Sequence, residues 1–136
     1  MNRIFTEDEA EDPRLGASVT HRRYVSYAHA HYAGNLVDGA YVLGLFGDVA
    51  TELSIRTDGD EGLLAAYESV QLLAPVHGGD VIETTATVTR VGRRSRGIEL
   101  EARVVCRGRP DKSPSSADVL DPPLVVTRAQ ATVVVP

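Results

Sequence analysis

The chain has 136 residues, of which 43% are hydrophobic, so it is long enough for one domain with one core and too short for two. Its single cysteine excludes an intramolecular disulfide framework, and no apolar run approaches the roughly 20 residues that a membrane span needs, so we expect a cytoplasmic protein without a membrane partner. The net charge of −5 argues against nucleic acid as the main partner.

The N-terminal part is acidic, with five Asp or Glu residues in the first dozen positions. Such a cluster is typical of a solvated tail, so we assign residues 1–18 to a tail and residues 19–136 to a single domain. Residues 19–28 (VTHRRYVSYA) are expected to form the first strand, because β-branched and aromatic residues are frequent there.

The next segment, Leu36 to Leu53 (LVDGAYVLGLFGDVATEL), is apolar on nearly every side, which predicts a buried helix. Asn35 can act as its N-cap, and Asp38 complements the positive helix end. Three glycines within the helix are poor helix formers, which suggests that something packs very close to its backbone.

Four further strands are predicted from alternation, at residues 63–73, 80–91, 95–106 and 124–135, with a hairpin at 92–97 between the middle two. In the third of these strands one face is apolar, and we expect it to be buried: Ile98, Leu100, Ala102 and Val104. Cys106 is expected to be a buried structural thiol. The Pro-, Ser- and Asp-rich residues 107–123 are predicted to be an inserted loop.

The order of one strand, a long buried helix and four strands predicts an α+β fold in which an antiparallel sheet wraps around one central helix, the hot-dog arrangement. One short sheet cannot cover such a helix fully. We therefore expect a homodimer, which can assemble further into a hexamer.

The start of the helix is the first candidate site. The run His31, Tyr32, Ala33, Gly34, Asn35 leads directly into it, and unpaired amides at a helix start can bind an anion or a developing oxyanion. Gly34 and Gly39 would allow a ligand to approach the backbone closely. An ordinary helix cap after a turn is the alternative.

Asp48 and Glu52 are the second candidate site, because they lie four residues apart on one face of an apolar helix. Burial would raise the pKa of such a carboxyl group toward the range useful for proton transfer. The alternative is that one or both reach solvent, which is the stronger alternative for Glu52 near the helix end.

Three arginines in the hairpin, Arg93, Arg94 and Arg96, suit phosphate recognition, and a solvated turn is the equal alternative. His29 and His31 are too few for a metal site, so no metal is expected. We expect His21 and His77 at the surface. Tyr67 either packs in the core or directs its hydroxyl at a ligand.

These residues also carry a resemblance to a known family. The motifs HY-x-GNLV-x-GA, GDV-x-TEL, DGD followed by a tyrosine, and APV-x-x-GD resemble the β-aminoacyl-CoA ammonia-lyases over positions 29 to 92. The resemblance implies a hot-dog enzyme that eliminates ammonia reversibly from a 3-aminoacyl-CoA thioester, with coenzyme A as part of the substrate and no other cofactor. The acidic N-terminal extension and the insertion depart from the family pattern, so a carrier-protein-bound acyl group stays open as the substrate.

The resemblance also assigns residues. It implies that the helix-start site consists of His31, Tyr32, Gly34, Asn35 and Gly39, that Tyr67 is a neighbouring polar group, and that Asp48 and Glu52 are the acid/base candidates. Asp48 is our candidate for the base that removes the α-proton. The competing hypotheses are a hot-dog acyl-CoA thioesterase, which needs the same groups, and a non-catalytic acyl-CoA-binding protein.

Overall fold

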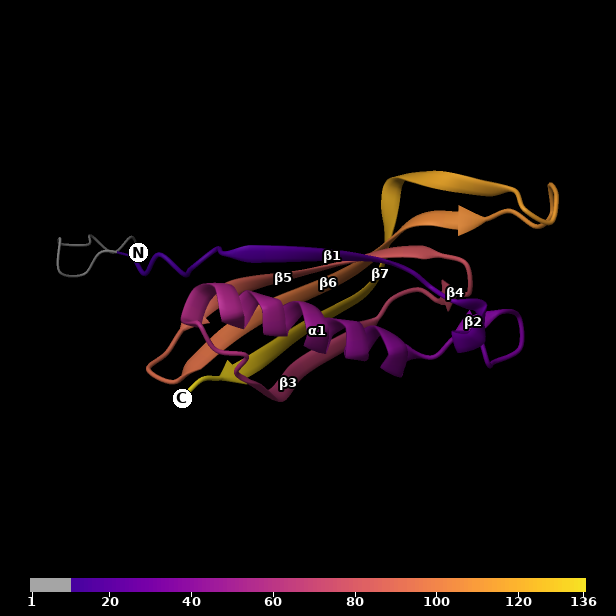
Figure 1. Cartoon of the computed structure of the whole chain (residues 1–136). Helices are drawn as coiled ribbons and strands as arrows, with labels where there is room; N and C mark the ends of the chain where they lie inside the picture. Colours follow the sequence, from indigo (N-terminus) through magenta and orange to yellow (C-terminus); the bar gives the residue numbers. More distant parts are fainter. Residues whose placement is uncertain (1–10) are drawn as a thin grey trace.

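The computed structural model describes residues 11–136, and its chain forms one layer of sheet with one helix against it (Figure 1). The elements in chain order are β1 (Ser18–Tyr24), the 3₁₀ turn η2 (Tyr27–His29), β2 (Leu36–Val37), α1 (Gly39–Asp58), β3 (Leu63–Leu72), β4 (Val76–His77), β5 (Val81–Val91), β6 (Ser95–Gly108) and β7 (Ala117–Val134).

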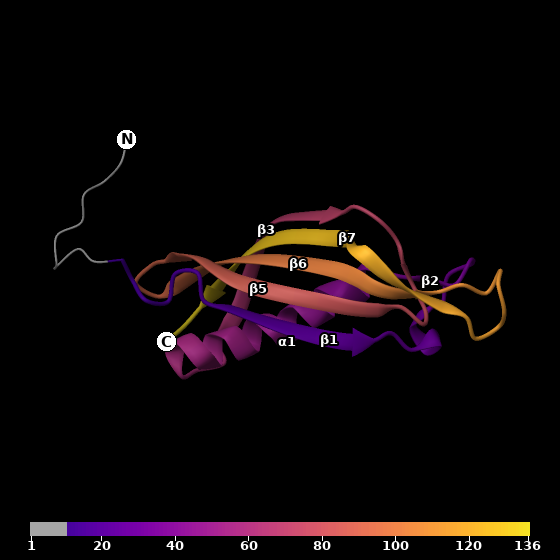
Figure 2. The same cartoon turned by 90° about the horizontal axis from the view of Figure 1, so that it is seen from above.

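The main sheet is antiparallel, with five strands in the order β1-β5-β6-β7-β3, and α1 lies across its concave face (Figures 1 and 2). The residues expected on the buried face of β6 are indeed buried, as are alternate residues of β5 such as Ile82, Ala86 and Val88. The predicted α+β hot-dog arrangement is therefore confirmed.

The helix begins later than the sequence suggested. Leu36 and Val37 pair with the strand β4, and Asn35 has a left-handed backbone with φ of 61°. None of these three residues can therefore belong to the helix. The N-cap is Asp38, whose carboxylate accepts the amide of Tyr41 at 2.9 Å. The prediction of Asn35 as the cap is wrong because a short strand pair intervenes.

One side of α1 is buried against the sheet, through Val42, Phe46, Val49 and Leu53, which follow helical spacing. The opposite side carries small residues. A Cβ added at Gly44 or Gly47 would meet nothing within 4 Å in residues 11–136. The helix is therefore half covered, not buried on all sides as its apolar sequence predicted.

The predicted loop at 107–123 is mostly a β-hairpin. β6 runs to Gly108 and β7 starts at Ala117, so only residues 109–116 form the turn, and the hairpin projects from the body as an arm (Figure 1). The prolines of this segment lie outside the paired positions, Pro110 and Pro114 in the turn and Pro122 and Pro123 in the interruption of the ladder between Val119 and Leu124. Cys106, at the base of the arm, is only partly buried, contrary to the prediction.

The predicted acidic tail, residues 1–18, lies largely outside the described residues. Within the described part, the chain packs from Asp12 onward, since Arg14 bonds to both Asp12 and Asp58 and the amide of Gly16 donates to Val88. No helix in residues 11–136 is long and apolar enough to cross a membrane.

Candidate active site

At the start of α1, His31 contacts the residue that caps the helix. Its Nε2 lies 2.6 Å from Oδ2 of Asp38, and this bond, followed by the amide of Tyr41, lowers the pKa of the Asp38 carboxyl group. His31 and the neighbouring Tyr32 are both exposed, and their ring centroids lie 4.4 Å apart. His31 thus contacts the acidic residue that caps the first amides of the helix.

The loop before the helix is held by backbone geometry that favours glycine. Gly34 has φ of 77°, and the side-chain amide of Asn35 donates to the carbonyl of Gly78 at 2.9 Å. A Cβ at Gly78 would lie 2.7 Å from Oδ1 of Asn35, so glycine is required there. Gly34 and Asn35 line a cavity of about 990 Å³ that the projecting arm closes on one side, together with Tyr24 and Tyr27.

Gly39 lies on the other side of the helix start, in a cavity of about 310 Å³ between α1 and the end of β3. A Cβ at Gly39 would lie 3.0 Å from Cδ1 of Leu72, so the close approach predicted for the helix glycines occurs at this position. His31, Gly34, Asn35 and Gly39 thus all lie near the start of the helix, but Gly34 and Asn35 line one cavity and Gly39 lines another.

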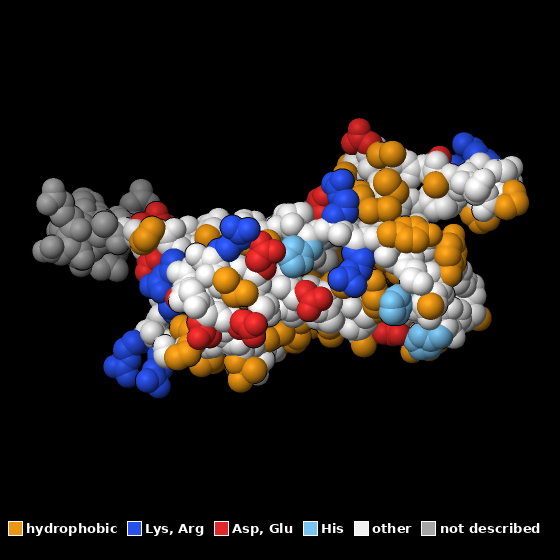
Figure 3. All heavy atoms as spheres, viewed as in Figure 1, with side chains coloured by type: hydrophobic (Ala, Val, Ile, Leu, Met, Phe, Trp, Pro, Cys, Tyr) orange, Lys and Arg blue, Asp and Glu red, His pale blue; other side chains and the backbone are white. Residues whose placement is uncertain are grey.

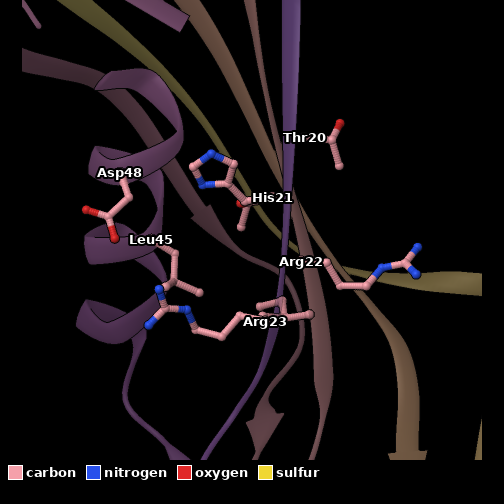
Figure 4. Close-up of a pocket in the computed structure, with 8 residues that line it drawn as sticks. Thr20, His21, Arg22, Arg23, Leu45 and Asp48 are labelled. Atoms are coloured by element: carbon pink, nitrogen blue, oxygen red, sulfur yellow. The ribbon is translucent and has the colours of Figure 1, made fainter. Parts of the chain in front are cut away.

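A separate cavity of about 320 Å³ lies between β1 and the middle of α1 (Figure 4). Residues 20–23 of the strand all line it, with the side chains of His21 and Arg23 directed toward the helix and those of Thr20 and Arg22 to the other side. Asp48 reaches the cavity from α1. In Figure 3, histidine, acidic and basic side chains gather along the boundary between the helix and β1.

Asp48 is exposed, so the predicted burial of this carboxylate is wrong for the single chain. The cause is the direction of the helix face, because Asp48 lies opposite the side that covers the sheet. Within residues 11–136, Asp48 has no hydrogen-bond partner and no ion pair, which leaves its full accepting capacity available to a ligand in the cavity.

Glu52 is a bonded carboxylate. It accepts from Nε of Arg56 at 2.7 Å and contacts Nε2 of His21 at 2.8 Å, and these two bonds lower the pKa of Glu52 instead of raising it as expected. His21 was expected at the surface, but it lines the cavity. The alternation of β1, with His21 and Arg23 on one face, was the signal that sequence reasoning missed.

The helix start and Asp48 are too far apart to act on the same atoms within one chain. Asp48 lies nine positions after Gly39, which at a rise of 1.5 Å per residue is about 14 Å along the helix. In a thioester the carbonyl oxygen and the α-carbon are less than about 3 Å apart. One protomer therefore supplies two half-sites.

Tyr67 lies on β3 and directs its hydroxyl at the helix, where it donates to the carbonyl of Leu43 at 3.4 Å. Burial raises the pKa of this phenol. Tyr67 lines neither of the cavities that contain Asp48 or Gly39, so the structure does not bring it to the other predicted site residues.

The arginine hairpin lies at the opposite end of the helix from the helix start. Arg93 and Arg94 are exposed, but Arg96 is buried, donates to Asp58 through Nε and Nη2, and donates to the carbonyls of Gly92 and Ser95. The prediction that Arg96 binds a phosphate is therefore wrong, because its donors are already used inside the domain.

Comparisons with known proteins agree with this architecture. The family model described as the thioesterase superfamily matches residues 34–111. A 3-aminobutyryl-CoA ammonia lyase of Acetoanaerobium sticklandii is 55% identical over 107 residues, which cover 79% of this chain and 85% of that protein.

Two solved structures extend the comparison. The β-alanyl-CoA:ammonia lyase from Clostridium propionicum superposes with a TM-score of 0.84 and 32% identity, over 89% of this chain and 86% of that chain. A hexameric hot-dog fold thioesterase of Campylobacter jejuni superposes with a TM-score of 0.70 over 85% of this chain and 80% of that one, and its 18% identity supports the fold alone. The chain therefore belongs to the β-aminoacyl-CoA ammonia-lyase family within the hot-dog thioesterase superfamily.

Proposed function

We propose that the protein is a carbon–nitrogen lyase that removes ammonia reversibly from a 3-aminoacyl-CoA thioester of the 3-aminobutyryl or β-alanyl type. The observation that carries the proposal is an unpartnered carboxylate, Asp48, in a cavity of a chain that is 55% identical to a 3-aminobutyryl-CoA ammonia lyase. Both lyase relatives are named for CoA thioesters, which favours CoA over a carrier protein as the acyl carrier.

The chemistry requires two groups close to the thioester. In the elimination direction, Asp48 takes the proton from the α-carbon while the first amides of α1 hold the enolate oxygen. The C–N bond at the β-carbon then breaks, its electron pair goes to nitrogen, and the products are an enoyl thioester and ammonia. The addition runs through the same steps in reverse.

The distance of about 14 Å between the two half-sites implies that a complete site needs a second copy of the chain. Two features support a homodimer. β3 is an edge strand with exposed Leu63, Val70 and Leu72, and an unpaired apolar edge favours pairing with another strand. The outer side of α1, with Gly44 and Gly47, can accept a close neighbour. Hexamers formed from three dimers are the further expectation.

The test is incubation of the protein with crotonyl-CoA or acryloyl-CoA and ammonium, followed by mass spectrometry. We expect an adduct that is one ammonia heavier than the enoyl-CoA. A parallel assay for free thiol examines hydrolysis, because the thioesterase function needs the same helix start and the same carboxylate. Release of free CoA without an ammonia adduct would replace the lyase by a thioesterase, and a protein that binds crotonyl-CoA without either reaction would be a non-catalytic binder.

The dimer has its own test in light scattering at micromolar concentration. We expect a dimer or a multiple of it, and replacement of the exposed Leu72 by Lys should weaken the assembly, because a charge on an edge strand opposes pairing. The matched control is Val119→Lys, at an apolar position on the arm that is even more exposed than Leu72. A stable, folded monomer of the wild type would contradict the proposed dimer.

A further inference from the structure

We propose that His21, held by Glu52, is the catalytic group that takes a proton from ammonium before addition and returns a proton to ammonia after elimination. The inference rests on the proposed lyase function and adds a residue to its site. It assigns separate tasks to two neighbouring groups, with Asp48 acting at the α-carbon and His21 acting at the nitrogen.

The geometry of the cavity supports this assignment. Nε2 of His21 lies 2.8 Å from Oε1 of Glu52, and Nδ1 has no protein partner among residues 11–136. The ring and Asp48 line the same cavity of about 320 Å³ from opposite walls, His21 from β1 and Asp48 from α1 (Figure 4). The α- and β-carbons of the substrate are bonded to each other, so the groups that serve them must share one cavity.

The hydrogen bond to Glu52 fixes the state of the imidazole. A carboxylate at Nε2 accepts the proton of that nitrogen, which leaves the lone pair on Nδ1 available to accept another proton. The negative charge of Glu52 then stabilises the imidazolium that forms. Arg56 orients Glu52 from the other side, through a bond of 2.7 Å to Oε2.

The proton balance closes within the cavity. In the addition direction, ammonium gives one proton to Nδ1 of His21, and the ammonia that results attacks the β-carbon with its lone pair. The enolate then takes the proton carried by Asp48 at the α-carbon. The proton on His21 passes to Asp48 through solvent in the cavity, which restores both groups and uses no further reactant.

Few charged side chains face His21. From α1 it faces Glu52, with Arg56 behind it, and Asp48 across the cavity; on β1 its neighbour on the same face is Arg23. β5 contributes the uncharged Ile82 and Thr84. Arg23 carries a fixed positive charge, so the imidazole and Asp48 are the groups of this cavity that can accept a proton.

The experiment compares two nucleophiles in His21→Gln. With ammonium at pH 7, addition to crotonyl-CoA should fall at least 100-fold, which is the lower range for a general base. With hydroxylamine, which is already neutral at pH 7, the rate should stay within a few-fold of the wild type. The deficit with ammonium should shrink as the pH rises and free ammonia accumulates.

A second readout isolates the α-carbon. Exchange of the α-protons of butyryl-CoA with D₂O involves no amine, so His21→Gln should keep it and Asp48→Asn should lose it. Arg128→Gln is the matched control, since Arg128 lies on β7, lines none of the cavities described above and pairs with Glu101 at 3.2 Å. This control should add ammonia at the normal rate.

Three outcomes decide the matter. Normal ammonium addition by His21→Gln would overturn the proposal, and so would an equal loss with ammonium and hydroxylamine, because that pattern indicates a role in structure. A wild type that forms no adduct with either nucleophile would reject the lyase function itself, and the role of His21 with it.

Discussion

Asp48 and Asp58 lie on the same helix, ten residues apart, yet their surroundings differ in almost every respect. Asp58 lies at the end of α1 with its side chain only 8% exposed, and its carboxylate accepts from Arg96, Arg14 and the hydroxyl of Thr57. Asp48 is exposed in the middle of the helix, faces a cavity and has no partner among residues 11–136.

The comparison distinguishes a carboxylate that stabilises the fold from one that is available for catalysis. Burial acts to raise the pKa of Asp58, but the hydrogen bonds from Arg96, Thr57 and Arg14 outweigh it, and the net effect lowers that pKa. All accepting capacity of Asp58 is used inside the domain. The capacity of Asp48 is unused, so it is free to take a proton from a substrate.

The largest effect is expected for Asp48→Asn. The change is nearly isosteric and occurs at an exposed position, so the fold and the assembly should persist. Ammonia addition to crotonyl-CoA should fall by roughly 10²–10⁴-fold, the usual contribution of a general acid or base. Steady-state kinetics measures the loss, and thermal unfolding should give an unchanged Tm.

Glu52→Gln is the control on the same helix face. Because the pKa of Glu52 is lowered and its oxygens are bonded, we expect a smaller loss of activity than for Asp48→Asn. Near-normal turnover by Asp48→Asn together with an inactive Glu52→Gln would reverse the two roles and leave the reaction class intact.

Asp58→Asn should show the opposite behaviour. Removing one partner of a buried ion pair leaves Arg96 without its counter-charge and costs about 3 kcal/mol of unfolding free energy. Thermal denaturation should therefore show a Tm lower by roughly 10 °C. The specific activity of the protein that remains folded should be close to that of the wild type, and a large loss there would remove the distinction between the two carboxylates.

The same residue predicts how stability depends on pH. The pKa of Asp58 is lower in the folded protein than its ordinary value of 3.8, so its contribution is fully present above the unfolded value and is lost as the pH falls through the folded value. The difference in unfolding free energy between wild type and Asp58→Asn should thus be constant above about pH 5 and decrease below about pH 4. Denaturant titrations across this range measure it, and a difference that grows in acid would contradict the assignment.

Part of the fold and of the candidate site could be predicted from the sequence, and part could not. The strands at 80–91 and 95–106 were predictable because alternation records which face is buried, as at Ile98 and Leu100. The burial of Asp48 was mispredicted because an apolar helix looks the same whether a sheet or a second chain covers its outer side. The positions of His21 in the cavity and of Arg96 inside the domain depend on contacts between segments more than 30 residues apart, and no local sequence pattern records such contacts.

The smallest effect on activity is expected from substitutions in the arginine hairpin. There, too, one charged residue stabilises the fold while its neighbours are free to bind a ligand. Arg93 and Arg94 are exposed and have no ion pair in the described residues, so they remain our candidates for the phosphates of CoA. Replacing both by Ala should raise KM for the CoA thioester several-fold with little change in kcat, because such contacts are remote from the reacting bond. Arg96→Ala should instead lower the Tm, as Asp58→Asn does, since it breaks the same pair. An unchanged KM in Arg93→Ala/Arg94→Ala would identify the pair as part of a solvated turn, whereas Arg96 would keep its structural role in either case.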